Sequence, residues 1–188
     1  MNKEALLIVD YQKDFWEKDW SLYVKGWELL VPEMNRLIAE TKERSWIVIA
    51  SRDWHPANHC SFKIWPAHCV ENTRWAEYVD WLDIRAIEHE VRKWFRSDKD
   101  SYSAFGWYEF RWEYALRSLH DLLRDYEIRL LRIAWLVTDY CIKATAIDWI
   151  DHGFEVEVIG NAVKAVDINP EDWENAIKEM KDRWVRII

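Results

Sequence analysis

Five apolar residues followed by an acid, Ala5-Leu6-Leu7-Ile8-Val9-Asp10, stand close to the N-terminus. A short, continuously apolar run of this kind predicts a strand that is buried on both faces, as in a parallel sheet. The pattern recurs in Trp46-Ile47-Val48-Ile49-Ala50-Ser51, and residues 27–44 between the two runs place their apolar side chains at helical spacing. A strand, a helix and a second strand predict a β-α-β unit with parallel strands.

The same alternation continues along the rest of the chain. After a loop region at residues 53–83, we predict strands at 87–93, 129–137, 154–159 and 184–188, with helices at 108–125, 139–152 and 170–183. Gly153 is expected to follow the end of the second of these helices, and Pro170 to occupy the first position of the last. The predicted fold class is α/β: a mainly parallel six-stranded sheet with helices on both faces, in a Rossmann-like three-layer arrangement.

Composition restricts the kind of protein that this chain can be. It has 188 residues, of which 50% are hydrophobic and 32% charged, so we expect a single folded domain over residues 1–188. The net charge of −8 provides no general basic surface, and we expect neither nucleic acid nor a membrane as a partner. With three cysteines, no long apolar run and no signal peptide, the expected location is cytoplasmic.

Chemically active residues are expected where the predicted strands end, because open parallel sheets bind ligands beyond their carboxyl edges. Asp10, Lys93 and Cys141 all follow or end such strands. A helix N-terminus at Cys141 would lower the pKa of the thiol and offer N–H groups to an oxyanion, although this segment alone slightly favours a buried core cysteine. Asp10 can act as a base and Lys93 can stabilise an anion, but each of them alone is best interpreted as an ordinary surface charge.

A second group of residues has the character of metal ligands. Asp53, His55, His59 and His68 lie in one loop region, and carboxylate with imidazole suits zinc, manganese or iron. The alternative is a set of polar loop residues without a ligand. Asp53 and His55 alone favour this alternative. Because three histidines cluster within 14 residues, a metal site and a set of ordinary polar loop residues are about equally supported.

Taken together, these segments resemble the nicotinamidase/pyrazinamidase branch of the isochorismatase-like hydrolases. The resemblance extends in order over essentially the whole chain. The segments that carry it are Ile8–Phe15, Ser51–Pro56, Trp65–Val70, Arg92–Lys93, Asp100–Phe105, Thr138–Cys141 and Ala144–Asp148.

This resemblance implies an isochorismatase-like fold and the hydrolysis of nicotinamide, and also of pyrazinamide, to the acid and ammonia through a cysteine thioester, in NAD salvage. The residues that match the family's catalytic triad are Asp10, Lys93 and Cys141. The matches to its metal ligands are Asp53, His55 and His68, with His59 at a position that provides a further ligand in some members. The resemblance implies one divalent metal ion, with zinc as the first choice and iron or manganese as alternatives.

The resemblance also implies where the substrate lies. Phe15, Trp65 and Tyr102 match aromatic residues that line the pocket for the pyridine ring. The backbone N–H groups of Val137 and Cys141 match the oxyanion hole, which in the family depends on a cis peptide bond, here Leu136–Val137.

Glycine and tryptophan contents are abnormal, with 4 glycines and 15 tryptophans. Tryptophan stands where the family usually has glycine, at Trp20, Trp27, Trp46, Trp75, Trp94, Trp107, Trp135 and Trp184. We interpret the chain as a Trp-enriched, Gly-depleted engineered variant. Trp135 is expected to disturb the site most, because its indole either narrows the pocket or pushes a central strand.

Two alternative functions remain open. One is an inactive or impaired scaffold on the same fold. The other is a hydrolase for a different small amide, which ranks lower because those relatives lack the pattern of Asp53, His55 and His68. The many aromatic residues also favour apolar surface patches and association into a homo-oligomer.

Overall fold

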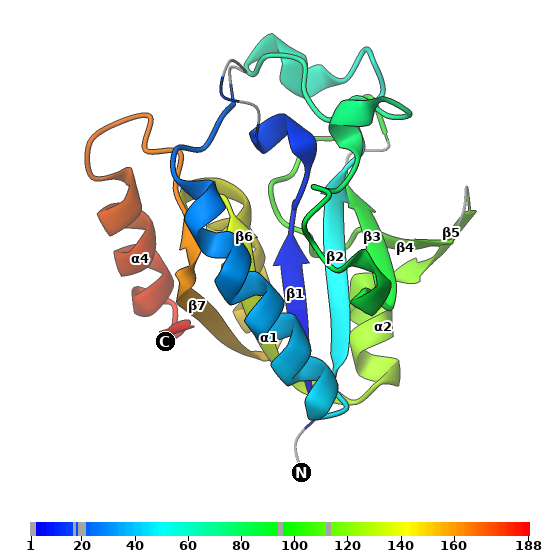
Figure 1. Ribbon diagram of the computed structural model, residues 1–188, viewed down its shortest axis with the longest axis vertical. Coiled ribbons are helices and arrows are strands. Elements are labelled where there is room, and N and C mark those ends of the chain that lie inside the picture. The colour runs from blue at the N-terminus through cyan, green and yellow to red at the C-terminus, as the bar shows by residue number, and fades with distance from the viewer. Residues whose placement is uncertain (1–2, 17, 19–21, 94–95, 112–113) are drawn as a thin grey trace.

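The apolar run near the N-terminus forms β1 (Lys3–Val9), a central strand of the sheet in this computed structural model (Figure 1). The structure describes all residues except 1–2, 17, 19–21, 94–95 and 112–113. Within the described residues the sheet has eight strands in the order β5-β4-β3-β2-β1-β6-β7-β8. Its other strands are β2 (Ile47–Asp53), β3 (His89–Lys93), β4 (Tyr108–Arg111), β5 (Tyr114–Ser118), β6 (Ile128–Leu136), β7 (Glu155–Lys164) and β8 (Arg186–Ile187).

Helices cover both faces of this sheet, as predicted. They are α1 (Val31–Glu43), α2 (Leu119–Asp125), α3 (Lys143–Asp151) and α4 (Asp172–Asp182). One apolar cluster joins α1 to the sheet through Met34 and Leu37, whereas a second joins α2, α3 and α4 through Leu122, Trp149 and Met180. Figure 1 accordingly shows α1 in front of the sheet and α2 behind it. None of the described helices is both long and apolar enough to cross a membrane.

The prediction of a helix over residues 108–125 was wrong in its first part. Residues 108–118 form β4 and β5, an antiparallel pair that continues the sheet beyond β3, and only α2 is helical. Tyr108 and Phe110 are residue types that favour strands, and the free edge of β3 supplies hydrogen-bonding partners, so sheet pairing prevails over the helical pattern. The six predicted strands are the six parallel ones, and this hairpin accounts for the two additional strands.

The start of the last helix also differs from the prediction. Helix α4 begins at Asp172 with Glu171 as its N-cap residue, so Pro170 lies before the helix and not at its first position. The prediction for Gly153 is confirmed: it follows the C-cap of α3 with φ of 85°, a conformation that glycine adopts without strain.

The parallel strands bring their carboxyl ends to one edge of the sheet. In register, Val9 lies beside Ser51 and Trp135, and Asp53 lies beside Lys93. The residues that end or follow these strands therefore meet at the edge towards which β1 points in Figure 1.

Candidate active site

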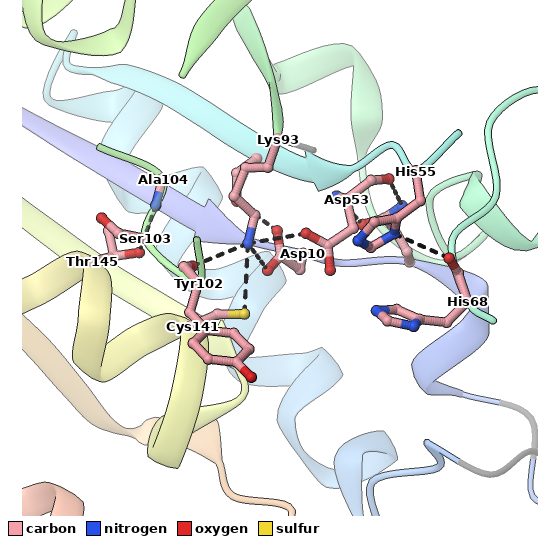
Figure 2. A network of polar contacts seen from close by, with 12 residues as sticks. Asp10, Asp53, His55, His68, Lys93, Tyr102, Ser103, Ala104, Cys141 and Thr145 are labelled. Atoms are coloured by element: carbon pink, nitrogen blue, oxygen red, sulfur yellow. Dashed lines mark hydrogen bonds and ion pairs between the residues drawn. The ribbon is translucent and has the colours of Figure 1, made fainter. Parts of the chain in front are cut away.

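Four side chains from four strand ends converge at this edge (Figure 2). Asp10 follows β1, Asp53 ends β2 and Lys93 ends β3, while Cys141 lies in a π-helical turn, Thr138–Ile142, that connects β6 to α3. The structure thus brings together all three residues that match the catalytic triad and places a metal-ligand candidate beside them.

Lys93 is the common partner of this group. Its side chain is fully buried, and Nζ lies 2.6 Å from Asp10 Oδ2 and 3.0 Å from Asp53 Oδ1. Nζ also donates to the backbone oxygen of Tyr102 at 3.3 Å and to Cys141 Sγ at 3.5 Å. Burial alone would lower the pKa of Lys93, but the two carboxylates outweigh it and raise the pKa well above the usual range. The amine is therefore charged at neutral pH.

Asp10 has the properties of a general base. Ser51 Oγ donates to Asp10 Oδ1 at 2.8 Å, and the carboxyl group is buried. Burial and the nearby charge of Asp53 raise the pKa of Asp10 to about 6, although Lys93 opposes the rise. A carboxylate with a pKa close to neutrality is well suited to exchange protons with a nearby group.

Cys141 is buried and neutral in this resting arrangement. Burial raises the pKa of the Cys141 thiol well above its usual range, even though the adjacent Lys93 charge opposes the rise. A hydrogen bond with Asp10 acts in the same direction as burial. The lowering of this pKa expected from the helix N-terminus is therefore outweighed, and the thiol needs a base to become a nucleophile.

Three buried side chains form a group able to hold a metal ion. One ligand atom from each of Asp53, His55 and His68 lies within 4.8 Å of the others. His55 Nδ1 lies 3.0 Å from the backbone oxygen of His68, and His68 Nδ1 lies 2.8 Å from that of Pro66. A carbonyl oxygen only accepts, so each Nδ1 carries the proton and each Nε2 keeps its lone pair for a metal. Burial lowers the pKa of His55 to about 3, which keeps this ring neutral at neutral pH.

His59 lies near this group but outside it. Its ring centroid is 4.6 Å from that of His55. Its Nδ1 accepts from the backbone N–H of Ser61 at 3.2 Å, and its Nε2 donates to the backbone oxygen of Lys99 at 3.0 Å. Because both ring nitrogens are used in these bonds, the described arrangement contains three candidate ligands and not four.

An aromatic cavity opens beside Cys141. Phe15, Trp65 and Tyr102 line it, as the resemblance implied, and so do Val137 and His68. The indole Nε1 of Trp65 donates to the Tyr102 hydroxyl at 2.9 Å. The cavity is also lined by Leu22, Tyr140 and Val166, which were not predicted from the sequence. Of these only Tyr140 had a signal, because it directly precedes the candidate nucleophile.

The candidate oxyanion residues also reach this cavity. Val137 and Cys141 both line it, and the peptide bond Leu136–Val137 is cis, as the resemblance implied. The indole of Trp135 points away from it into the core, where its ring centroid lies 3.9 Å from that of Tyr11. Of the two positions expected for this side chain, the structure therefore shows the one in the core. Trp20 and Trp94 lie outside the described residues.

Comparisons with known proteins identify the family of this chain. Residues 4–188 match the Isochorismatase domain family. The nicotinamidase of Escherichia coli (strain K12) is 38% identical in an alignment that covers 96% of this chain and 92% of that protein. The pyrazinamidase of Pyrococcus horikoshii, solved in complex with zinc, is 38% identical with a TM-score of 0.85, and the match covers 99% of this chain and 98% of that one. PnC1 from L. infantum, solved in complex with nicotinate, is 32% identical with a TM-score of 0.87 and coverages of 100% and 92%.

Proposed function

This chain belongs to the isochorismatase family, and from that premise we propose that it hydrolyses nicotinamide to nicotinate and ammonia and accepts pyrazinamide as a second substrate. The observation that carries the proposal is the position of Lys93, whose amine links the candidate base Asp10 to the candidate nucleophile Cys141 beside an aromatic cavity. A flat aromatic amide fits such a cavity because aromatic walls favour stacked and edge-on ring contacts.

Catalysis begins with proton transfer from the Cys141 thiol to Asp10, after which the thiolate Sγ attacks the amide carbon. The carbonyl oxygen takes the negative charge, and the N–H groups of Val137 and Cys141 hold it. Asp10 then returns the proton to the leaving nitrogen, so that ammonia departs and an acyl thioester remains. Water attacks the thioester, Asp10 accepts its proton, and nicotinate leaves as the thiol is restored.

Lys93 stays charged through this cycle. Its amine lies close enough to Cys141 Sγ to stabilise the thiolate, and its bonds to both carboxylates keep them in place. Removal of Lys93 would leave two buried carboxylates without a counter-ion, which is strongly unfavourable.

The residues present fit one divalent metal ion. Asp53, His55 and His68 supply a carboxylate and two neutral imidazoles, a donor set that suits zinc and also iron or manganese. When bound, the metal supplies a cationic anchor for the ring nitrogen of the substrate, directly or through a water. In Figure 2 the imidazoles of His55 and His68 lie to the right of Lys93 Nζ and Cys141 lies below it, so a ring that reaches the metal and an amide beside Cys141 would lie in different parts of the site.

Ammonia release from nicotinamide, measured with and without a chelator, tests the proposal. We expect turnover by the zinc-loaded protein, loss of turnover after chelation and recovery when zinc is returned. Turnover that a chelator leaves unchanged would contradict the role of the metal. A folded, zinc-loaded protein that releases no ammonia from nicotinamide or pyrazinamide would favour an impaired scaffold, and release from another small amide alone would favour a different substrate.

A further inference from the structure

The turn after β1 contains a buried glutamine that the proposed mechanism does not use. Gln12 is fully buried, and its side chain bonds to the backbone of Asp53 in both directions. Gln12 Oε1 accepts the N–H of Asp53 at 2.7 Å, and Gln12 Nε2 donates to the carbonyl oxygen of Asp53 at 2.7 Å and to that of Ala76 at 3.0 Å.

These bonds continue the sheet beyond the end of β1. The backbone pairing of β1 with β2 ends at Val9 and Ser51, and Asp10 turns the chain away with φ of 57°. From that point the side-chain amide of Gln12 takes the place of a strand backbone beside Asp53. On its other side Asp53 is paired with Lys93, so the backbone of this metal-ligand candidate is held from both sides.

A second residue of the same turn holds the other half of the metal group. Asp14 is buried, and its Oδ2 accepts the backbone N–H of Cys69, the residue that follows His68. Cys69 has φ of 43°, a backbone conformation that residues other than glycine rarely adopt without support from their surroundings. Asp14 supplies such support directly beside a metal-ligand candidate.

We propose that Gln12 and Asp14 are positioning residues that set the spacing between Asp53 and His68 and fix both to the turn that carries Asp10. The inference rests on the metal site of the proposed function. Its basis is that one short turn, which contains Gln12 and Asp14, bonds to the backbone at Asp53 and at Cys69. In each case the two bonded residues are more than 40 positions apart in the sequence. Neither residue lines the aromatic cavity or belongs to the group of three candidate ligands; each acts through the backbone next to a candidate ligand.

Affinity for zinc, measured on chelator-stripped protein by competition with a chromogenic chelator, tests this inference. Gln12→Met and Asp14→Leu keep the side-chain volume approximately and remove the hydrogen bonds. We expect each to weaken zinc binding by about 10- to 100-fold, the range typical of groups that orient metal ligands. Asp14→Asn keeps a carbonyl acceptor for Cys69 and is expected to restore most of the affinity.

The matched control is Thr41→Val in α1, which removes a buried hydrogen bond from Thr41 Oγ1 to the Leu37 oxygen far from the metal group. This variant should bind zinc as the wild type does. Zinc affinity within twofold of wild type in Gln12→Met or Asp14→Leu would overturn the inference, and so would equal weakening in Thr41→Val. If Gln12→Met fails to fold, Gln12→Asn, which keeps the amide but shortens its reach, takes the same test. A wild type that binds no zinc would instead refute the metal site itself.

Discussion

At the scale of single residues, Lys93 sets the charge balance of the site. One buried ammonium faces two buried carboxylates, Asp10 at 2.6 Å and Asp53 at 3.0 Å. Burial raises the pKa of both carboxyl groups, but the charge of Lys93 outweighs it only at Asp53: the pKa of Asp53 is lowered, whereas that of Asp10 rises to about 6. The group that lies next to the thiol is thus the one able to take up a proton.

This balance predicts the dependence of activity on pH. Asp10 must be unprotonated to accept the thiol proton, and it becomes protonated as the pH falls through about 6. We expect kcat/KM for nicotinamide to fall about tenfold for each pH unit below that value, because kcat/KM reports the ionisation of the free enzyme. Zinc content should be measured at each pH to separate this effect from loss of metal. A value of kcat/KM that stays constant down to pH ~5 would contradict the assignment of Asp10 as the base.

Cys141 gives the second prediction at this scale. Of the three cysteines, Cys141 alone contacts Lys93 Nζ among the bonds described, and it lines the aromatic cavity. Replacement Cys141→Ala should abolish ammonia release while leaving circular dichroism and zinc content unchanged, because the change removes one small buried side chain that is not a metal-ligand candidate. Cys69→Ala is the matched control for a buried cysteine. Appreciable turnover by Cys141→Ala would exclude a thioester intermediate.

At the scale of elements, two helices end in the same way with different residues. After α3, the N–H of Gly153 bonds to the Ile150 oxygen and that of Phe154 to the Trp149 oxygen. After α4, the N–H of Trp184 bonds to the Lys181 oxygen and that of Val185 to the Met180 oxygen. Both ends are Schellman motifs, in which the first residue after the C-cap adopts positive φ. Gly153 has φ of 85° and Trp184 has φ of 66°, so tryptophan occupies a position that favours glycine.

Replacement Trp184→Gly is therefore expected to stabilise the protein. The Trp184 side chain is 84% exposed, so little packing is lost, whereas relief of the left-handed conformation gains about 1 kcal/mol. Urea unfolding measures the difference in the free energy of unfolding.

Trp135→Gly is the informative contrast, because Trp135 also has positive φ, at 97°, but is only 1% exposed. Loss of its buried ring costs more than the strain relieved, and we expect net destabilisation by about 2 kcal/mol. A Trp184→Gly variant less stable than wild type would contradict this account.

Elements also show what the sequence could predict. Apolar runs, together with the alternating pattern of residues 87–93, predicted all six parallel strands. The rule that sites lie at the carboxyl ends of such strands drew attention to Asp10, Lys93 and Cys141, because both inferences depend on local patterns. The helix prediction failed at residues 108–118 because the same aromatic pattern suits a helix or an edge hairpin. Pairing with the free edge of β3 decides between the two. Gln12 and Val166 were missed since their positions depend on segments distant in sequence, and a polar or apolar side chain alone does not reveal its tertiary partners.

At the scale of the whole molecule, the candidate metal ligands connect the sheet to the long loop between β2 and β3. Asp53 ends β2 in the sheet, whereas His68 belongs to the loop region between β2 and β3. His55 joins the two, because its N–H bonds to the Cys69 oxygen and its own oxygen accepts from Glu71. A ligand bound to all three residues is present only when this loop is folded onto the sheet, so its binding free energy adds to the free energy of unfolding.

This linkage predicts that zinc raises the melting temperature of the whole chain. Free zinc at one hundred times its dissociation constant contributes about 2.7 kcal/mol to the folded state. For a chain of 188 residues, each kcal/mol shifts Tm by about 2–4 °C, so we expect a rise of about 5–10 °C over the chelator-treated protein. Scanning calorimetry of the wild type and of a His55→Ala, His68→Ala double variant, with zinc and with chelator, measures it. The double variant should show no rise, because a single carboxylate binds zinc weakly, and an equal rise in both proteins would place the zinc elsewhere on the molecule.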